Sequence, residues 1–260
     1  IPVRLAKEKL GPHAIDDIIA QAKKFGVETP IRKDVTIPIG TSEVTVLDQA
    51  TAYAVFPADG LQSRRHGIEQ IMDYDGKVLY DFNRDEPPPK RVLSQKAEKY
   101  MLEMLTRVPY VGTARKAAVD GVLTGGKTGT TSGYRDAWFC GFTGNYTAAV
   151  WFGNDDYTSS NNMTGGSLPA MTFKLLMDYA HQGIALRPLP EIDNPAPEID
   201  PKTAQAEAKR REEQAQDPNQ PKFVRPRMLT VNSTKLLREI GEKLKNAAPL
   251  KTIEKVAEAQ

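Results

Sequence analysis

The sequence predicts an α+β fold in which an antiparallel sheet is flanked by helices. Apolar residues recur at helical spacing in four separate segments, at residues 12–25, 44–56, 93–108 and 168–183. Between the last two lie Thr-rich and aromatic runs separated by short turn signals, a pattern typical of strands joined as hairpins. Helices before and after such a sheet indicate an α+β fold.

Each predicted helix has a defined apolar face or end. The face of helix 12–25 is formed by Ile15, Ile18, Ile19, Ala22 and Phe25, and Gly26 is expected to stop that helix. The second helix is expected to begin near Thr45 and to end before Pro57. For helix 93–108, the residues expected to point inward are Ala97, Tyr100, Met101, Met104, Leu105 and Val108.

Two groups of strands are predicted. The run "GIEQIMDYDGKVLYDF" alternates around Asp75-Gly76 and predicts a β-hairpin. Further on, the turn signals "GYRD" and "TGNY" separate three adjacent strands, at about 124–130, 136–143 and 146–153. The segment "LPAMTFKLLMDYAHQG" then predicts a closing helix that ends at Gly183.

Composition excludes several classes of function. The chain has 260 residues and a net charge of +2, which gives no reason to expect a nucleic-acid partner. A single cysteine, Cys140, excludes an intrachain disulfide, and isolated histidines give no metal-ligand spacing, so neither a metal nor another cofactor is expected. The sequence contains no run of about 18 apolar residues of the kind that crosses a membrane.

The composition changes after residue 187. We expect residues 1–187 to form one packed unit and residues 188–260, rich in Pro, charge and Gln, to be mostly disordered. Within that tail, residues 232–246 have the spacing of a short amphipathic helix.

The stretch "GVLTGGKTGTT" matches two different motifs. Gly121-x-x-x-x-Gly126-Lys127-Thr128 fits the phosphate-binding P-loop, whereas Lys127-Thr128-Gly129 fits the third motif of penicillin-reactive serine enzymes. A P-loop needs an apolar strand before it and a helix after it. Here a polar, helix-prone segment precedes the match and a Gly- and Thr-rich segment follows it, which disfavours the nucleotide hypothesis.

The second motif fits its surroundings as the start of an antiparallel strand. Lys127 would supply positive charge near a substrate carboxylate, and Thr128 and Thr130 would supply hydroxyl groups. Gly129 would let a ligand backbone approach the strand, and the N–H of Thr130 would form half of an oxyanion hole. Thr131 is a weaker candidate for substrate binding. We also expect Arg135 to pair with Asp136, and Trp138 and Trp151 to lie in the core.

Besides "GGKTGTT", the chain contains the segments "RVPYVGTARKA", "DAWFCGFT", "AVWFGNDD", "GGSLPAMTFKLLMDYA" and "AYAVFPADG". Together they resemble the C-terminal part of the transpeptidase domain of class A, bifunctional penicillin-binding proteins. The resemblance covers residues 1 to about 183. It implies the penicillin-binding and serine β-lactamase-like fold, here partial. It also implies Lys127, Thr128, Gly129 and Thr130 as catalytic or substrate-binding residues, with Thr131 beside them.

Two of the family's three motifs have no counterpart in this chain. No serine is followed by a lysine at the Ser-x-x-Lys spacing, and Ser-x-Asn occurs only at residues 159–162, after the Lys-Thr-Gly rather than before it. Because a segment like "IPVRLA" directly follows Ser-x-Asn in the family, we expect the nucleophile and both missing motifs upstream, and no acyl-enzyme on this chain alone.

The resemblance also implies partners and a location. The substrate would be a peptidoglycan stem peptide ending in D-Ala-D-Ala, and β-lactams would be inhibitors. The N-terminal remainder of the same protein would complete the site, at the periplasmic face of the bacterial inner membrane with an anchor upstream. Two alternatives stay open: a noncatalytic module that binds the wall or a partner protein, and the P-loop nucleotide hydrolase.

Overall fold

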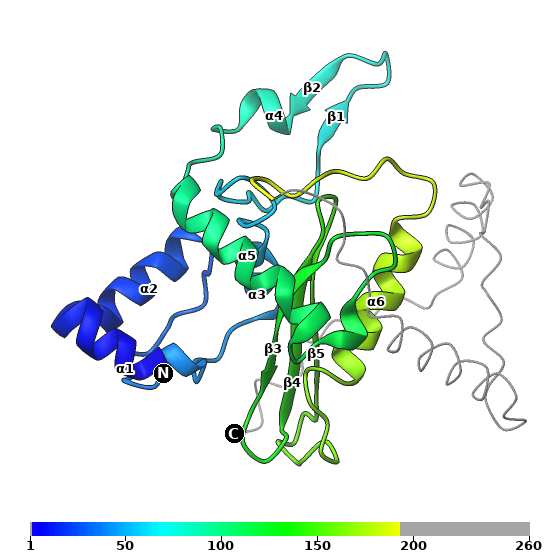
Figure 1. The fold of residues 1–260 in the computed structure, drawn as a ribbon. Coiled ribbons are helices and arrows are strands. Elements are labelled where there is room, and N and C mark those ends of the chain that lie inside the picture. Colours follow the sequence, from blue (N-terminus) through cyan, green and yellow to red (C-terminus); the bar gives the residue numbers. More distant parts are fainter. Residues whose placement is uncertain (1, 193–260) are drawn as a thin grey trace, which may run out of the picture. The chain divides into compact units, whose positions relative to one another are not determined.

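A computed structural model describes residues 2–192 (Figure 1). The predicted helix at 232–246 and the tail beyond residue 192 lie outside the described residues. The helices are α1 (Pro2–Leu5), α2 (Ala14–Lys24), α3 (Val46–Tyr53), α4 (Phe82–Asp85), α5 (Gln95–Val111) and α6 (Leu168–Ala180). The strands are β1 (Gln70–Met72), β2 (Val78–Asp81), β3 (Gly125–Thr130), β4 (Asp136–Phe142) and β5 (Thr147–Gly153).

The three later strands form one antiparallel sheet in the order β3-β4-β5. Lys127 on β3 lies opposite Cys140 on β4, and Trp138 on β4 lies opposite Trp151 on β5. The predicted strands are confirmed to within two residues at each end. Both connections are short, because the "GYRD" and "TGNY" segments form the predicted turns.

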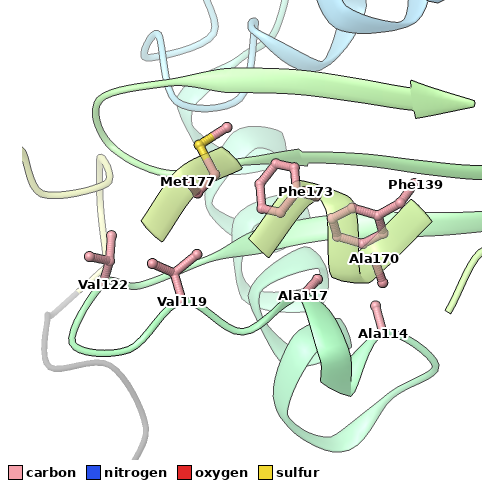
Figure 2. Close-up of a cluster of buried hydrophobic side chains, with 8 residues drawn as sticks. All are labelled: Ala114, Ala117, Val119, Val122, Phe139, Ala170, Phe173 and Met177. Carbon is pink, nitrogen blue, oxygen red and sulfur yellow. The ribbon is translucent and has the colours of Figure 1, made fainter. Parts of the chain in front are cut away.

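One face of this sheet packs against α6. Phe173 of α6 is fully buried, and its ring meets that of Phe139 on β4 edge-on, with ring centroids 4.9 Å apart. Figure 2 shows these rings with Ala170 and Met177 of α6 and with small residues that precede β3. The predicted closing helix is therefore confirmed as one layer of the core.

The opposite face packs against α5 and the end of α3. Phe142 on β4 is fully buried among Leu102 and Leu105 of α5 and Phe56, which follows α3. Leu189 joins the same cluster and is 3% exposed, so the chain continues to pack on this core past residue 187. Because side chains alternate along a strand, Phe139 and Phe142 reach opposite faces of β4.

Helix α3 is fixed by a buried carboxylate. Asp48 is 1% exposed and forms a capping box with Thr45 at the start of the helix. Its carboxylate also accepts hydrogen bonds from the N–H of Glu28 at 3.0 Å and from Thr29, and it pairs with Arg65. Burial alone would raise the pKa of Asp48, but these hydrogen bonds outweigh it and hold the pKa well below its usual value.

The predicted hairpin around Asp75-Gly76 is present as β1 and β2, with Ile71 opposite Tyr80. Figure 1 shows it extending away from the three-stranded sheet. All three residues of β1 are exposed, so this hairpin adds little to the core.

The predicted inward face of α5 is partly wrong. Tyr100 and Met104 are 54% and 57% exposed, although their apolar side chains fit the expected stripe. The buried residues of the helix are Glu98, Leu102, Leu105, Thr106 and Pro109. The buried positions include an acidic residue that a hydrophobic pattern assigns to the solvent, while Tyr100 and Met104 lie on the exposed side of the helix.

Glu98 is fully buried, and neither of its carboxylate oxygens has a hydrogen-bond partner among residues 2–192. The nearest cation is Arg91, whose guanidinium lies 4.0 Å from Glu98 and is itself bound to Asp59 at 2.6 Å. Burial and the neighbouring charge of Asp59 raise the pKa of Glu98 to about 7, while Arg91 acts in the opposite direction.

We expect the Glu98→Gln variant to change how stability depends on pH. The folded state holds the Glu98 proton more tightly than the unfolded state, so this residue's contribution is present below about pH 4.5 and is lost as pH rises through about 7. Glutamine has no proton to lose, so the variant gains up to about 3 kcal/mol over the wild type above pH 7.

Thermal unfolding between pH 4.5 and 8.5 measures this difference. The exposed Glu103 on the same helix provides the matched control, and Glu103→Gln should change the free energy of unfolding by less than about 0.5 kcal/mol. If the stability of Glu98→Gln depends on pH in the same way as that of the wild type across that range, the raised pKa of Glu98 is wrong.

Candidate active site

The Lys-Thr-Gly residues lie on β3, at one edge of the sheet. Lys127 and Gly129 belong to the face that carries Cys140 and Trp138, which is the face toward α3 and α5. Thr128 and Thr130 belong to the opposite face, toward α6. Gly129 also has a packing reason to lack a side chain, because an added Cβ would lie 3.2 Å from the Cβ of Trp138.

The backbone of β3 presents alternate peptide groups to its free side. Just past the strand end, Thr131 donates its N–H to the carbonyl of Asp136 at 3.1 Å, so this N–H points toward β4. Because peptide groups alternate along an antiparallel strand, those of Thr128 and Thr130 point the other way. Within the described part of the chain, no strand pairs with that side of β3.

The ammonium group of Lys127 lies at the same edge. Its Nζ donates to the carbonyl oxygen of Thr128 at 2.8 Å, which is one of the outward-facing groups. The side chain starts on the α3 face but ends beside the edge. Lys127 and the outward N–H of Thr130 therefore sit along one line of backbone that a second extended chain could join.

Two contacts that sequence patterns did not predict hold the hydroxyls on the α6 face. The Oγ1 atoms of Thr128 and Thr113 are 2.7 Å apart, and the N–H of Gly165 donates to Oγ1 of Thr130 at 3.1 Å. The only sequence signals were the "GT" before the η4 turn (Arg115–Ala117) and the "GG" before α6. Neither signal identifies a partner 15 or 35 residues away.

The turn after β3 is closed by Asp136, not by the predicted pair of Arg135 with Asp136. Among the described residues, the Asp136 carboxylate accepts from the Thr131 hydroxyl at 3.0 Å and from the Trp151 indole N–H at 3.0 Å. Thr131 also accepts from the Asp136 N–H, so its hydroxyl is committed to the turn. The expected core position of Trp151 is wrong, since it is 37% exposed, while Trp138 is half-buried.

The Ser-x-Asn match at residues 159–162 belongs to the loop between β5 and α6. Both the N–H and the hydroxyl of Ser160 donate to the carbonyl of Tyr134 in the β3–β4 turn. Tyr134 has a φ of 56°, which is uncommon for a bulky residue. The loop thus holds the turn in a strained conformation.

The P-loop hypothesis fails on topology. Gly121 precedes β3 and Gly126 is its second residue, and the strand continues through a turn into β4 rather than into a helix. The helix N-terminus that would hold phosphate is therefore missing at this position.

Other potential reactive groups are sparse. Cys140 is buried, as predicted, and burial raises the pKa of its thiol to about 12, which keeps it protonated. Across residues 2–192, no three His, Cys, Asp or Glu side chains gather in a way that could hold a metal ion. In the same range, none of the helices combines the length and apolarity needed to cross a membrane.

The antiparallel sheet, with its Lys-Thr-Gly edge strand and helices on both faces, fits the class of penicillin-reactive enzymes that the sequence resembles. Residues 12–178 match the family described as "Penicillin binding protein transpeptidase domain", and the chain belongs to that family. It is 34% identical over 154 residues to penicillin-binding protein 1A of Aquifex aeolicus, covering 59% of this chain and 21% of that protein. It is 34% identical over 119 residues to penicillin-binding protein 4 of Bacillus subtilis, covering 46% and 19%.

Solved structures share the fold. PonA1 of Mycobacterium tuberculosis in complex with penicillin V matches with a TM-score of 0.60 at 23% identity, covering 74% of this chain and 56% of that chain. Penicillin-binding protein 1A of Haemophilus influenzae matches with a TM-score of 0.55 at 23% identity, covering 75% and 36%. The chain spans about a fifth of the length of the curated relatives it matches.

We expect Gly165→Ala to disturb the site. A Cβ at Gly165 would lie 2.1 Å from the carbonyl oxygen of Trp138 and 2.6 Å from that of Gly129, so backbone must move. Gly67→Ala is the matched control, because a Cβ there meets nothing within 4 Å.

Thermal unfolding should show a loss of about 1–3 kcal/mol for Gly165→Ala and less than about 0.5 kcal/mol for Gly67→Ala. Amide hydrogen exchange should also speed up at Gly165 in the first variant. Equal behaviour of the two variants would show that the loop does not pack on β3 as described.

Proposed function

We propose that this chain supplies the Lys-Thr-Gly side of the active site of a serine-type D,D-transpeptidase, which crosslinks peptidoglycan stem peptides and is inhibited by β-lactams. The observation that carries the proposal is the free side of β3. There the Lys127 ammonium and the outward peptide groups lie along one strand edge, and two threonine hydroxyls lie on the α6 face of the same strand.

These groups suit an extended peptide that ends in a carboxylate. A stem peptide ending in D-Ala-D-Ala would run beside β3 and exchange backbone hydrogen bonds with it. Lys127, Thr128 and Thr130 would bind the terminal carboxylate through charge and hydroxyl donors. The outward N–H of Thr130 would bind the oxyanion, and Gly129 would leave room for the ligand backbone. Thr131 contributes least, since its hydroxyl already closes the turn.

The chemistry needs a nucleophile from elsewhere in the protein. A serine hydroxyl attacks the carbonyl of the penultimate D-Ala, the terminal D-Ala leaves with a proton, and the acyl group remains on the serine as an ester. An amine of a second stem then attacks the ester, and the serine is released. Because this chain contains no Ser-x-x-Lys, we place that motif and Ser-x-Asn on the preceding part of the protein. The chain alone then forms no acyl-enzyme.

This assignment also sets the partners and the location. Besides substrate and β-lactam, the main partner is the N-terminal remainder of the same protein, and the reaction takes place at the periplasmic face of the inner membrane. Membership of the penicillin-binding protein transpeptidase family supports the β-lactam part of the proposal. We place the transpeptidase part in residues 1–187 and extend it to Leu189, which packs in the same core, and we treat the sequence beyond as an appended segment.

A noncatalytic role in binding the wall or a partner protein is the second candidate. It is favoured by one observation, the lack of a Ser-x-x-Lys in this chain. Such a module would bind stem peptides without turnover and would not react with penicillin in any form of the protein.

We expect Lys127→Ala to slow acylation of the complete protein by a fluorescent penicillin by about 100-fold or more, because it removes a charged group from the anion site. The exposed Lys99 on α5 provides the control, and Lys99→Ala should react like the wild type. Stopped-flow or gel-based labelling gives the second-order rate constant. An unchanged acylation rate for Lys127→Ala would contradict the placement of β3 in the active site.

A further inference from the structure

Both threonine hydroxyls of the candidate site form hydrogen bonds with residues outside β3. Thr128 and Thr130 point to the α6 face, where two other segments meet them. Thr113 approaches from the loop after α5, and Gly165 approaches from the loop before α6. Each contributes one hydrogen bond, and neither has a role in the Lys-Thr-Gly motif.

The direction of the hydrogen bond at Thr130 is fixed. A backbone N–H can only donate, so the Gly165 N–H donates and the Oγ1 of Thr130 accepts. The Thr130 hydroxyl has a single proton, which is then free to be donated to something else. A hydroxyl that already accepts a hydrogen bond is a stronger donor, because such bonds polarise one another.

The bond between Thr113 and Thr128 can run either way, since each hydroxyl can donate or accept. An anion beside Thr128 removes this freedom. The Thr128 proton must turn to the anion, and Thr113 must then donate to Thr128. Without Thr113, the oxygen of Thr128 would lose this polarising donor.

Both supporting segments make close contacts with neighbouring backbone. A Cβ added to Gly166 would lie 2.1 Å from the carbonyl oxygen of Thr113, so the two loops are in direct backbone contact. The turn that carries Gly165 is closed by Ser167, whose hydroxyl donates to the carbonyl of Thr164 at 2.6 Å and accepts from its N–H at 3.1 Å. Thr113 and the Gly165 N–H therefore lie beside the two threonines in the structure without a ligand.

We propose that Thr113 is a positioning residue that, together with the Gly165 N–H, turns the hydroxyls of Thr128 and Thr130 into a pair of donors for the carboxylate of an acyl donor. This rests on the proposed function, since it assigns the carboxylate to those two threonines. It predicts that Thr113 governs the preference for a charged C-terminus and not the chemistry of acyl transfer.

The test compares two ligands on the complete protein. One is a depsipeptide acyl donor with a free C-terminal carboxylate, and the other is the same molecule with a C-terminal amide. Thr113→Val keeps the shape of the side chain and removes the hydroxyl. We expect it to lower kcat/KM for the carboxylate ligand by about 10-fold, mainly through KM, and to leave the amide ligand unchanged.

Two further variants complete the design. Thr113→Ser keeps a hydroxyl and should restore the preference, whereas Thr147→Val makes the same change at the far end of the sheet and should have no effect. The carboxylate-to-amide ratio does not depend on how much enzyme is folded, so partial loss of folded protein would not obscure the result.

The outcomes separate this inference from the proposed function. If Thr113→Val lowers kcat/KM equally for both ligands, or for neither, the positioning role is wrong. If Thr128→Val abolishes the carboxylate preference while Thr113→Val keeps it, the proposed function stands and only this inference fails. If the preference survives in a variant that combines Lys127→Ala, Thr128→Val and Thr130→Val, the carboxylate does not bind at β3 and both fail.

Discussion

The pairing of β3 with β4 is the constraint on which the rest of the structure depends. Gly125 and Gly126 open β3, and an added Cβ at these positions would lie 2.5 Å from the Phe142 ring and 2.6 Å from the Phe139 ring. The two glycines therefore make room on opposite faces for the rings at the centres of the two hydrophobic clusters. Because a slip of one residue would exchange the faces of β3, this packing also places Lys127 on the α3 face and the threonines on the α6 face.

Much of the fold follows from local patterns in the sequence. Hairpins around short turn signals, the capping box at Thr45 and the glycines after helices are local features, so the strands and most helices were predictable. The face of α5 was not, because it buries Glu98, and a hydrophobic pattern gives no reason to bury a carboxylate. The ion pair of Arg65 with Asp48 was missed because the two residues are 17 positions apart and no local pattern connects them.

In the candidate site, too, the local features were predictable from the sequence and the long-range contacts were not. A motif identified Lys127 to Thr130, because the spacing of residues along one strand is a local property. The partners of the hydroxyls come from two loops that only the folded chain brings together, and the Trp151 that bonds Asp136 lies on another strand. Strand β3 thus carries a positive charge from Lys127 on one face and threonine hydroxyls on the other. The two flanking loops orient the hydroxyls.

The central proposal is that β3 serves a serine that lies outside these 260 residues. Intact mass spectrometry of this chain and of the complete protein, each treated with penicillin and followed by peptide mapping, tests it most directly. The account predicts no adduct on this chain alone, and one adduct on the complete protein at a serine preceding this sequence. An adduct on any serine of the chain would contradict the account, and a complete protein that takes up no drug would favour the noncatalytic binding module.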